Sequence, residues 1–190
     1  MTPDFFSTED PAQMLFGGQS VRSIISDTKF KIGDFGNYIP LTPGEVIESD
    51  IKMTYLGFFE KWDPQNVFYY AVDNTGFTAA DIRSEGTYSR YTEIDDKIVP
   101  FHFYTTFLKF GIGRATYDAS QEIRNGHIER EEGVQLVRKY DGEFPARWLG
   151  DFLDYVSLSE SEFTQVCDGL RSPHLWDKTG DEYNLISQVR

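Results

Sequence analysis

The sequence predicts a mainly helical protein that begins as the remnant of an α/β fold. Its 190 residues suffice for one ordinary domain with a buried core, and the 39% hydrophobic and 16% aromatic content exceeds what a disordered segment carries. One or two buried strands are expected near the amino terminus, followed by a helical bundle around a long central helix. We therefore predict an α/β tail over residues 1–76 and a helical carboxy-terminal domain over residues 77–190.

The first fifty residues are repeatedly interrupted by Gly and Pro, which is typical of loops and short helices. The compact apolar segment Ile51–Phe59 is predicted to be a buried strand. Asp63 and Pro64 then resemble a helix N-cap with Pro at the first helical position, and Gly76 marks the end of that helix. Because one strand cannot form a sheet by itself, this region is expected to be the tail of a larger α/β domain.

The remainder of the chain has the apolar periodicity of helices after a polar, Gly-interrupted loop over Thr78–Tyr91. Stop signals after each apolar segment set the expected boundaries. The predicted helices are Pro100–Asn125, Arg130–Tyr140, Ala146–Val156 and Glu160–Leu170.

The charge balance argues against nucleic acid and anionic membranes as partners, because 18 Lys and Arg face 31 Asp and Glu, for a net charge of -13. Cys167 is the only cysteine, which excludes an intrachain disulfide and a cysteine-based zinc site. The sequence has no signal-peptide pattern at Met1 and no apolar run near the ~20 residues that span a bilayer. We therefore expect a cytoplasmic location without membrane insertion.

Charged side chains lie within the predicted long helix, which is apolar on two sides. One polar stripe contains Lys109, and a second contains Arg114, Asp118 and Glu122. Because burying a charge is costly unless it is paired or binds a ligand, at least one stripe is expected to face a cavity or another polar layer.

Two interpretations of these charges remain open. Arg114 and Asp118 are four residues apart and could form an ordinary intrahelical ion pair where the helix emerges into solvent. Gly111 and Gly113 favour function instead, because each costs about 1 kcal/mol relative to Ala inside a helix and suggests close approach of another backbone or a ligand.

Metal binding has little support in the sequence. His102 is expected to be a hydrogen-bonded core residue, because no other histidine has a metal-ligand spacing with it. Asp95 and Asp96 are expected to be acids at a helix start, with Mg²⁺ binding as the weaker alternative. The motifs GxxxxGKS/T, GxGxxG, GxSxG, HExxH and SGGxDS are absent, so common nucleotide, hydrolase and metalloprotease sites lack support.

Several segments are similar to one enzyme family. The segments YLGFFEKWDPQ, EGTYSRYTEIDDKI, FHFYTTFLKFGIGRATYDASQEIRNGHIEREEGVQLVRKYDGEFP and RSPHLWDK resemble the carboxy-terminal half of the N-acetyl sugar amidotransferases of surface-polysaccharide biosynthesis. The resemblance spans roughly Ile51–Lys178. It implies that residues 1–76 are the tail of a nucleotide-binding domain similar to that of asparagine synthetase.

The resemblance implies conversion of a sugar acetamido group into an acetamidino group during the biosynthesis of lipopolysaccharide and its O-antigen. In this chemistry ATP activates the amide oxygen, ammonia attacks the carbon and AMP leaves. Cations are then needed for phosphates and a sugar carboxylate, and acids are needed to orient ammonia and take its proton. The implied catalytic residues are Lys109, Arg114, Asp118 and Glu122, and the implied substrate-binding residues are Glu85, Lys97, His102 and Arg124.

The expected partners follow from the same resemblance. They are an acidic N-acetylated sugar or nucleotide sugar, a glutaminase-type supplier of ammonia, and a half or subunit that carries the SGGxDS pyrophosphate loop (the PP-loop). ATP and Mg²⁺ are expected to bind mainly to that other half. The chain could be a fragment, a split-gene subunit or a truncated relative; the alternative function is a non-catalytic substrate-binding or interaction module that docks a nucleotide-binding subunit.

Overall fold

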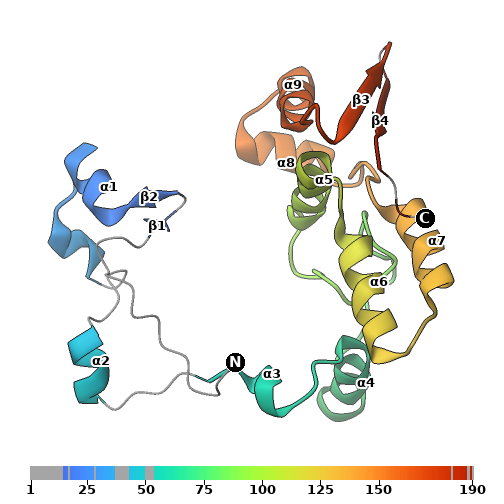
Figure 1. The fold of residues 1–190 in the computed structure, drawn as a ribbon, viewed down its shortest axis with the longest axis horizontal. Helices are drawn as coiled ribbons and strands as arrows, with labels where there is room; N and C mark the ends of the chain where they lie inside the picture. The colour runs from blue at the N-terminus through green and yellow to red at the C-terminus, as the bar shows by residue number, and fades with distance from the viewer. Residues whose placement is uncertain are drawn as a thin grey trace. The chain divides into compact units, whose positions relative to one another are not determined.

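The computed structural model describes residues 15–16, 18–27, 29–36, 43–49, 54–180, 182–187 and 189. The chain divides into two compact units, residues 1–62 and 63–190, and each is described by itself. Helices dominate both units, with small antiparallel sheets (Figure 1), which confirms the predicted mainly helical class. Among the described residues, no helix is long and apolar enough to cross a membrane.

The first unit contains short elements, as expected from its Gly and Pro content. The predicted buried strand is wrong where it is described: Leu56 and Phe59 are 73% and 61% exposed and lie in a one-turn helix. This segment belongs to neither described sheet, and its backbone forms local hydrogen bonds, such as Glu60 N–H to Leu56 C=O. Residues 51–53 of that prediction lie outside the described residues. The elements are β1 (Leu15–Phe16), β2 (Gln19–Ser20), α1 (Val21–Asp27), the 3₁₀ helix η2 (Ile32–Phe35), α2 (Pro43–Ser49) and α3 (Leu56–Phe59).

The second unit contains the longer helices and a carboxy-terminal hairpin. The predicted helices 130–140 and 160–170 are confirmed, and the predicted helix 146–156 begins at Leu149 instead. The antiparallel hairpin, in which Trp176 pairs with Leu185, was not predicted. The elements are α4 (Pro64–Thr75), α5 (Val99–Phe110), α6 (Arg114–Asn125), α7 (Arg130–Tyr140), α8 (Leu149–Val156), α9 (Glu160–Leu170), β3 (Trp176–Thr179) and β4 (Glu182–Leu185).

Helix α4 begins and ends where the sequence indicates. The Asp63 carboxylate accepts a hydrogen bond from the Asn66 backbone N–H at 3.2 Å, Pro64 occupies the first turn, and Gly76 ends the helix with φ of 73°. The same Asp63 carboxylate lies 2.9 Å from Nε2 of His127, just after α6. This contact joins the start of α4 to the end of α6.

The predicted long helix 100–125 is wrong, because it is broken into α5 and α6. Gly111 ends α5 in the left-handed conformation with φ of 72°, and its N–H donates to Phe107 C=O. Gly113 is extended and precedes α6. The two glycines therefore have a structural explanation: they break the helix, and Gly113 permits the close approach of the segment that carries Asp141.

The start of α6 is capped by a carboxylate from another helix end. Asp141 follows α7, and its Oδ2 accepts from the Gly113 N–H at 3.0 Å while its Oδ1 accepts from the Thr116 N–H at 3.2 Å. The Thr116 hydroxyl also donates to Oδ2. A Cβ on Gly113 would lie 2.6 Å from Asp141 Oδ1, so only glycine leaves room for this cap.

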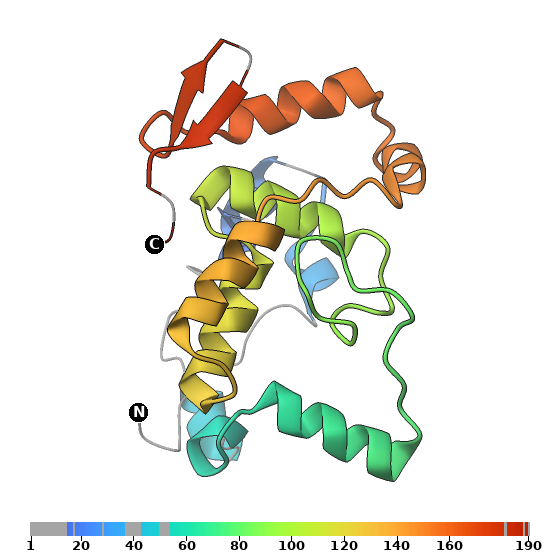
Figure 2. The same ribbon diagram turned by 90° about the vertical axis from the view of Figure 1, so that its right-hand side faces the viewer.

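Helices α6 and α7 lie side by side (Figures 1 and 2). Ala115, Ala119 and Val134 are buried, and small residues allow the two backbones to approach closely. A Cβ on Gly133 would meet Ile123 Cδ1 at 2.7 Å. One face of α6 is thus covered by α7, and another face remains available for contacts with other segments.

The main hydrophobic core lies between α5, α8 and α9. Phe101, Leu108, Phe163 and Cys167 are buried there. Phe101 stacks on Phe152 with ring centroids 3.9 Å apart. The core anchors α5, and with it the chain that leads into α6.

A bidentate ion pair attaches the loop before α5 to the segment after α7. Arg83 donates to both oxygens of Glu143 at 2.6 Å, and the Gly86 N–H donates to the same carboxylate at 2.8 Å. Arg83 also lies over the Tyr140 ring, 4.5 Å from its centroid. These contacts place loop 84–93 against α6.

Replacing Gly113 by Ala is expected to lower the free energy of unfolding by about 1–2 kcal/mol, because the new Cβ displaces the Asp141 cap. Gly169→Ala is the matched control, because its Cβ meets nothing within 4 Å. It is expected to add up to about 1 kcal/mol through helix propensity. Urea unfolding measures both, and a Gly113→Ala variant as stable as the wild type would contradict the capping role.

Replacing Glu143 by Gln is expected to cost about 2 kcal/mol at pH 7, because the charge-assisted bonds from Arg83 are lost. The hydrogen bond from Arg83 lowers the pKa of Glu143 below 4.5, so its stabilisation is present above that pH and disappears as pH falls through the folded-state pKa. The deficit of the variant should therefore shrink below pH 4.5. Unfolding curves at several pH values test this, with the exposed Glu131→Gln as control.

Candidate functional site

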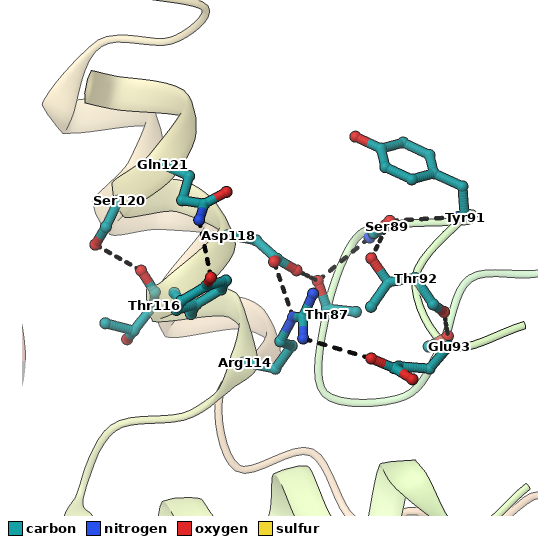
Figure 3. A network of polar contacts seen from close by, with 12 residues as sticks. Thr87, Ser89, Tyr91, Thr92, Glu93, Arg114, Thr116, Asp118, Ser120 and Gln121 are labelled. Carbon is teal, nitrogen blue, oxygen red and sulfur yellow. Dashed lines mark hydrogen bonds and ion pairs between the residues drawn. The ribbon is translucent and has the colours of Figure 1, made fainter. Parts of the chain in front are cut away.

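One face of α6 meets loop 84–93 in a network of polar contacts (Figure 3). Asp118 lies at its centre: Oδ2 accepts from the Thr87 hydroxyl at 2.6 Å and Oδ1 accepts from Arg114 Nε at 2.8 Å. Arg114 NH1 also lies 3.8 Å from Glu93 Oε1. The network thus joins two residues one helical turn apart to the loop that Arg83 and Glu143 hold in place.

Internal hydrogen bonds fix the conformation of loop 84–93, which forms one side of the site. The Thr87 side chain is fully buried, and its hydroxyl oxygen accepts from the Ser89 N–H at 3.3 Å. The Thr92 hydroxyl donates to Ser89 Oγ at 2.8 Å, and the Ser84 hydroxyl donates to the Thr92 carbonyl at 2.7 Å. Short hydroxyl side chains that bond to nearby backbone give this loop its shape without a helix or a strand.

The two carboxylates of this face are less acidic than usual. Burial raises the pKa of Asp118, although the Thr87 hydroxyl and Arg114 act in the opposite direction. Burial also raises the pKa of Glu122, one turn later, and the negative charge of Asp118 adds to the effect. Each carboxylate therefore holds a proton more readily than an exposed one, which suits general acid or base catalysis.

Two tyrosines of the loop lie next to these acids. Burial, reinforced by the charge of Glu122, raises the pKa of Tyr88, so its hydroxyl keeps its proton. That hydroxyl is buried beside the Glu122 carboxylate. Burial raises the pKa of Tyr91 to about 12. Its ring stacks on Phe68 of α4 and its hydroxyl donates to Gln65 Oε1 at 2.8 Å.

The predicted catalytic residues divide into two groups. Arg114, Asp118 and Glu122 come together on one face of α6, and the intrahelical ion pair between Arg114 and Asp118 is confirmed. Lys109 is exposed at the end of α5, with its ammonium nitrogen 5.3 Å from the Phe110 ring centroid. Of the two polar stripes, only that of Arg114 faces a polar layer, because the helix break at Gly111 separates it from Lys109; a catalytic role for Lys109 stays a prediction.

Two of the predicted substrate-binding residues have structural contacts. The Glu85 carboxylate accepts from the backbone N–H groups of Ala146 and Arg147 at 3.1 and 3.2 Å. Lys97 forms an ion pair with Asp151 at 2.6 Å. Both residues therefore attach the loop region to the segment around α8.

The other two predicted substrate-binding residues are exposed. His102 lies on α5, so the expectation of a core histidine is wrong. Arg124 lies in the last turn of α6. Neither has a side-chain contact to Asp118 or Glu122, and a role in substrate binding stays a prediction.

Sequence reasoning missed the loop side of the site, namely Thr87, Tyr88 and Glu93. The run TYSRYTE, residues 87–93, is rich in hydroxyl groups and carries an acid, which was the available signal. Periodicity gives no information about where a loop folds back, so its position opposite α6 could not be inferred. Glu93 also has a positive φ of 52°, an uncommon conformation for a residue with a side chain.

The cations named from the sequence do not converge on one phosphate-binding position. Lys97 and Arg114 are paired with acids, and the exposed Lys109 and Arg124 lie at the ends of different helices. In the part of the chain that the structure describes, no group of at least three His, Cys, Asp or Glu could hold a metal ion. The network around Asp118 is suited to proton transfer and polar recognition.

A separate cavity lies on another face of α6. It has a volume of about 380 Å³ and lies between α6, α7 and the residues around β4. Its walls are mainly apolar; Thr116 and Ser120 of α6 line it, whereas Arg114 and Asp118 do not. The apolar lining includes Phe107, Ile112, Ala119, Ile123, Val134 and Leu185.

Comparison with known proteins identifies the family. The family model described as LPS biosynthesis protein WbpG-like, C-terminal domain, matches residues 85–190, a range that contains both sides of the Asp118 network. No curated protein matches the chain. Because the matched range covers more than half of the sequence, the chain belongs to the family of WbpG-like lipopolysaccharide biosynthesis proteins, of which residues 85–190 form the C-terminal domain.

Proposed function

We propose that the chain is the carboxy-terminal half of an ATP-dependent N-acetyl sugar amidotransferase that converts a sugar acetamido group into an acetamidino group in O-antigen and lipopolysaccharide biosynthesis. The observation that carries the proposal is the partly buried carboxylate pair Asp118 and Glu122, which faces Thr87 and Tyr88 within the family domain. An amidotransferase needs such groups, because ammonia loses protons as it becomes a bound amidine nitrogen.

Each residue of the network has a distinct proposed task. Asp118 accepts a proton from the attacking nitrogen, and its raised pKa brings its basicity closer to the working pH. Thr87 and Arg114 keep the carboxylate oriented through their hydrogen bonds. Glu122 shares the site as a second proton acceptor, and the buried Tyr88 hydroxyl beside it orients this carboxylate.

ATP and Mg²⁺ are assigned in this proposal to a nucleotide-binding half with a PP-loop, because the candidate cations do not converge and no cluster of acids and histidines among the described residues could hold a metal ion. ATP would supply the activation of the amide oxygen. The other proposed partners are a glutaminase-type protein that delivers ammonia and an acidic N-acetylated sugar or nucleotide sugar. The side chains of the Asp118 network would then act on the acetamido end of that substrate.

A second function is favoured by one specific observation. Leu56, Phe58 and Phe59 are 73%, 51% and 61% exposed, an apolar surface of the kind that docks a partner. The chain would then be a non-catalytic module that binds a nucleotide-binding subunit through α3. This alternative predicts that the Asp118 network is dispensable for the activity of the complex.

The decisive variant is Asp118→Asn in the complex of this chain with its PP-loop half. The rate of amidination, measured by mass spectrometry of the sugar product with ATP, Mg²⁺ and ammonium, is expected to fall by about a hundredfold. The wild-type rate should also fall on acidification through the pKa of Asp118, which lies above 3.8, because the protonated carboxylate is no longer a base.

Asp154→Asn is the matched control, because Asp154 is an exposed acid of α8, and it should leave the rate unchanged. An Asp118→Asn complex that assembles and works at the wild-type rate would refute the catalytic proposal and favour the docking module. Replacing Leu56 and Phe59 together by Asp should abolish assembly if α3 is the docking surface.

A further inference from the structure

Arg114 is held in one orientation by contacts on three sides. Its Nε donates to Asp118 Oδ1 at 2.8 Å, and its guanidinium carbon lies 5.2 Å from the ring centroids of both Phe103 and Tyr117. Asp118 is itself fixed from the other side by Thr87. A planar cation fixed in this way presents its remaining N–H donors in a constant direction.

Those remaining donors have only a loose partner. NH1 of Arg114 lies 3.8 Å from Glu93 Oε1, beyond hydrogen-bond distance, and among the described residues Nε is the only guanidinium nitrogen with a hydrogen bond. The side chains of Arg114 and Glu93 are 24% and 35% exposed, so solvent and ligands reach this contact. An anchored guanidinium with unsatisfied donors is a ready site for a carboxylate, which it can bind with two parallel hydrogen bonds.

Glu93 has a backbone conformation that is uncommon for a residue with a side chain. Its φ of 52° lies in the left-handed region, which costs a residue with a Cβ of order 1 kcal/mol or more. The helix N-terminus does not compete for the same anion, because Asp141 already caps the Gly113 and Thr116 N–H groups.

We propose that Glu93 is an internal placeholder on a carboxylate-binding position of Arg114, and that the carboxylate of a ligand displaces it. Binding replaces the 3.8 Å ion pair between Arg114 and Glu93 by a bidentate hydrogen-bonded pair between Arg114 and the ligand carboxylate. Arg114 therefore favours acidic ligands over their neutral analogues. The inference rests on the proposed function only in taking the rest of the ligand to be a sugar. Arg114 is then a specificity-determining residue, and competition from Glu93 weakens the affinity of Arg114 for the ligand carboxylate.

The test follows the Arg114 Nε–H resonance in ¹⁵N-labelled protein during titration with sodium acetate, with sodium chloride at equal ionic strength as reference. Arg114→Lys assigns the resonance, because lysine lacks this group but keeps the charge. We expect a saturable shift with acetate that chloride does not produce. The same shift with both salts would overturn the inference.

Glu93→Gln provides the sharper measurement, because it leaves the pair of Arg114 with Asp118 intact. Removal of the competing charge should tighten acetate binding at least about threefold. Lys139→Gln, which removes a charge from an exposed position of α7, should leave the acetate affinity within about twofold of the wild type. An unchanged affinity in Glu93→Gln would overturn the placeholder role.

Calorimetry with UDP-glucuronate and UDP-glucose separates this inference from the proposed function. Glu93→Gln should tighten binding of the acid and not of the neutral sugar. If both nucleotide sugars bind equally and acetate leaves Arg114 unaffected, the inference fails while sugar binding survives. If acetate binds at Arg114 and neither nucleotide sugar binds, the carboxylate position is upheld and the proposed substrate loses support.

Discussion

The two acids that follow α7, Asp141 and Glu143, determine the geometry of the rest of the second unit. Asp141 accepts from the first N–H groups of α6, and Glu143 accepts from Arg83 and Gly86 in the loop before α5. Helix α6 and the loop are far apart in sequence, yet both are attached to one short segment. The Asp118 network exists because this segment brings its two halves together, so its precision depends on two carboxylates that belong to no catalytic proposal.

Helix boundaries in the second unit could be predicted where local signals decide them. The Asp63 cap, the Gly76 terminator and the start of α7 all depend on residues adjacent in sequence. The predicted long helix failed because apolar periodicity continues through Gly111 and Gly113, whereas α5 ends at the left-handed Gly111 and α6 begins under a cap from Asp141, 28 residues away. The buried strand at Leu56–Phe59 failed for a related reason, because apolar content indicates burial only when a partner surface is available.

The candidate site could be predicted on its helical side only. Arg114, Asp118 and Glu122 share a helix face by their spacing alone, so the sequence was sufficient to group them. Thr87, Tyr88 and Glu93 lie in a loop whose path is set by the distant Arg83 and Glu143 pair, and no local rule reveals that path. Lys109 shows the converse error, because a periodic stripe drawn through a helix break joins residues that the fold separates.

The single cysteine gives the second unit a built-in reporter of core opening. Cys167 is buried between α5 and α9, and burial raises the pKa of its thiol, so the reactive thiolate is scarce in the folded state. Alkylation of this thiol therefore requires the helices around Phe101 to separate. The alkylation rate therefore reports the local opening equilibrium of the core, because the sequence contains no other cysteine.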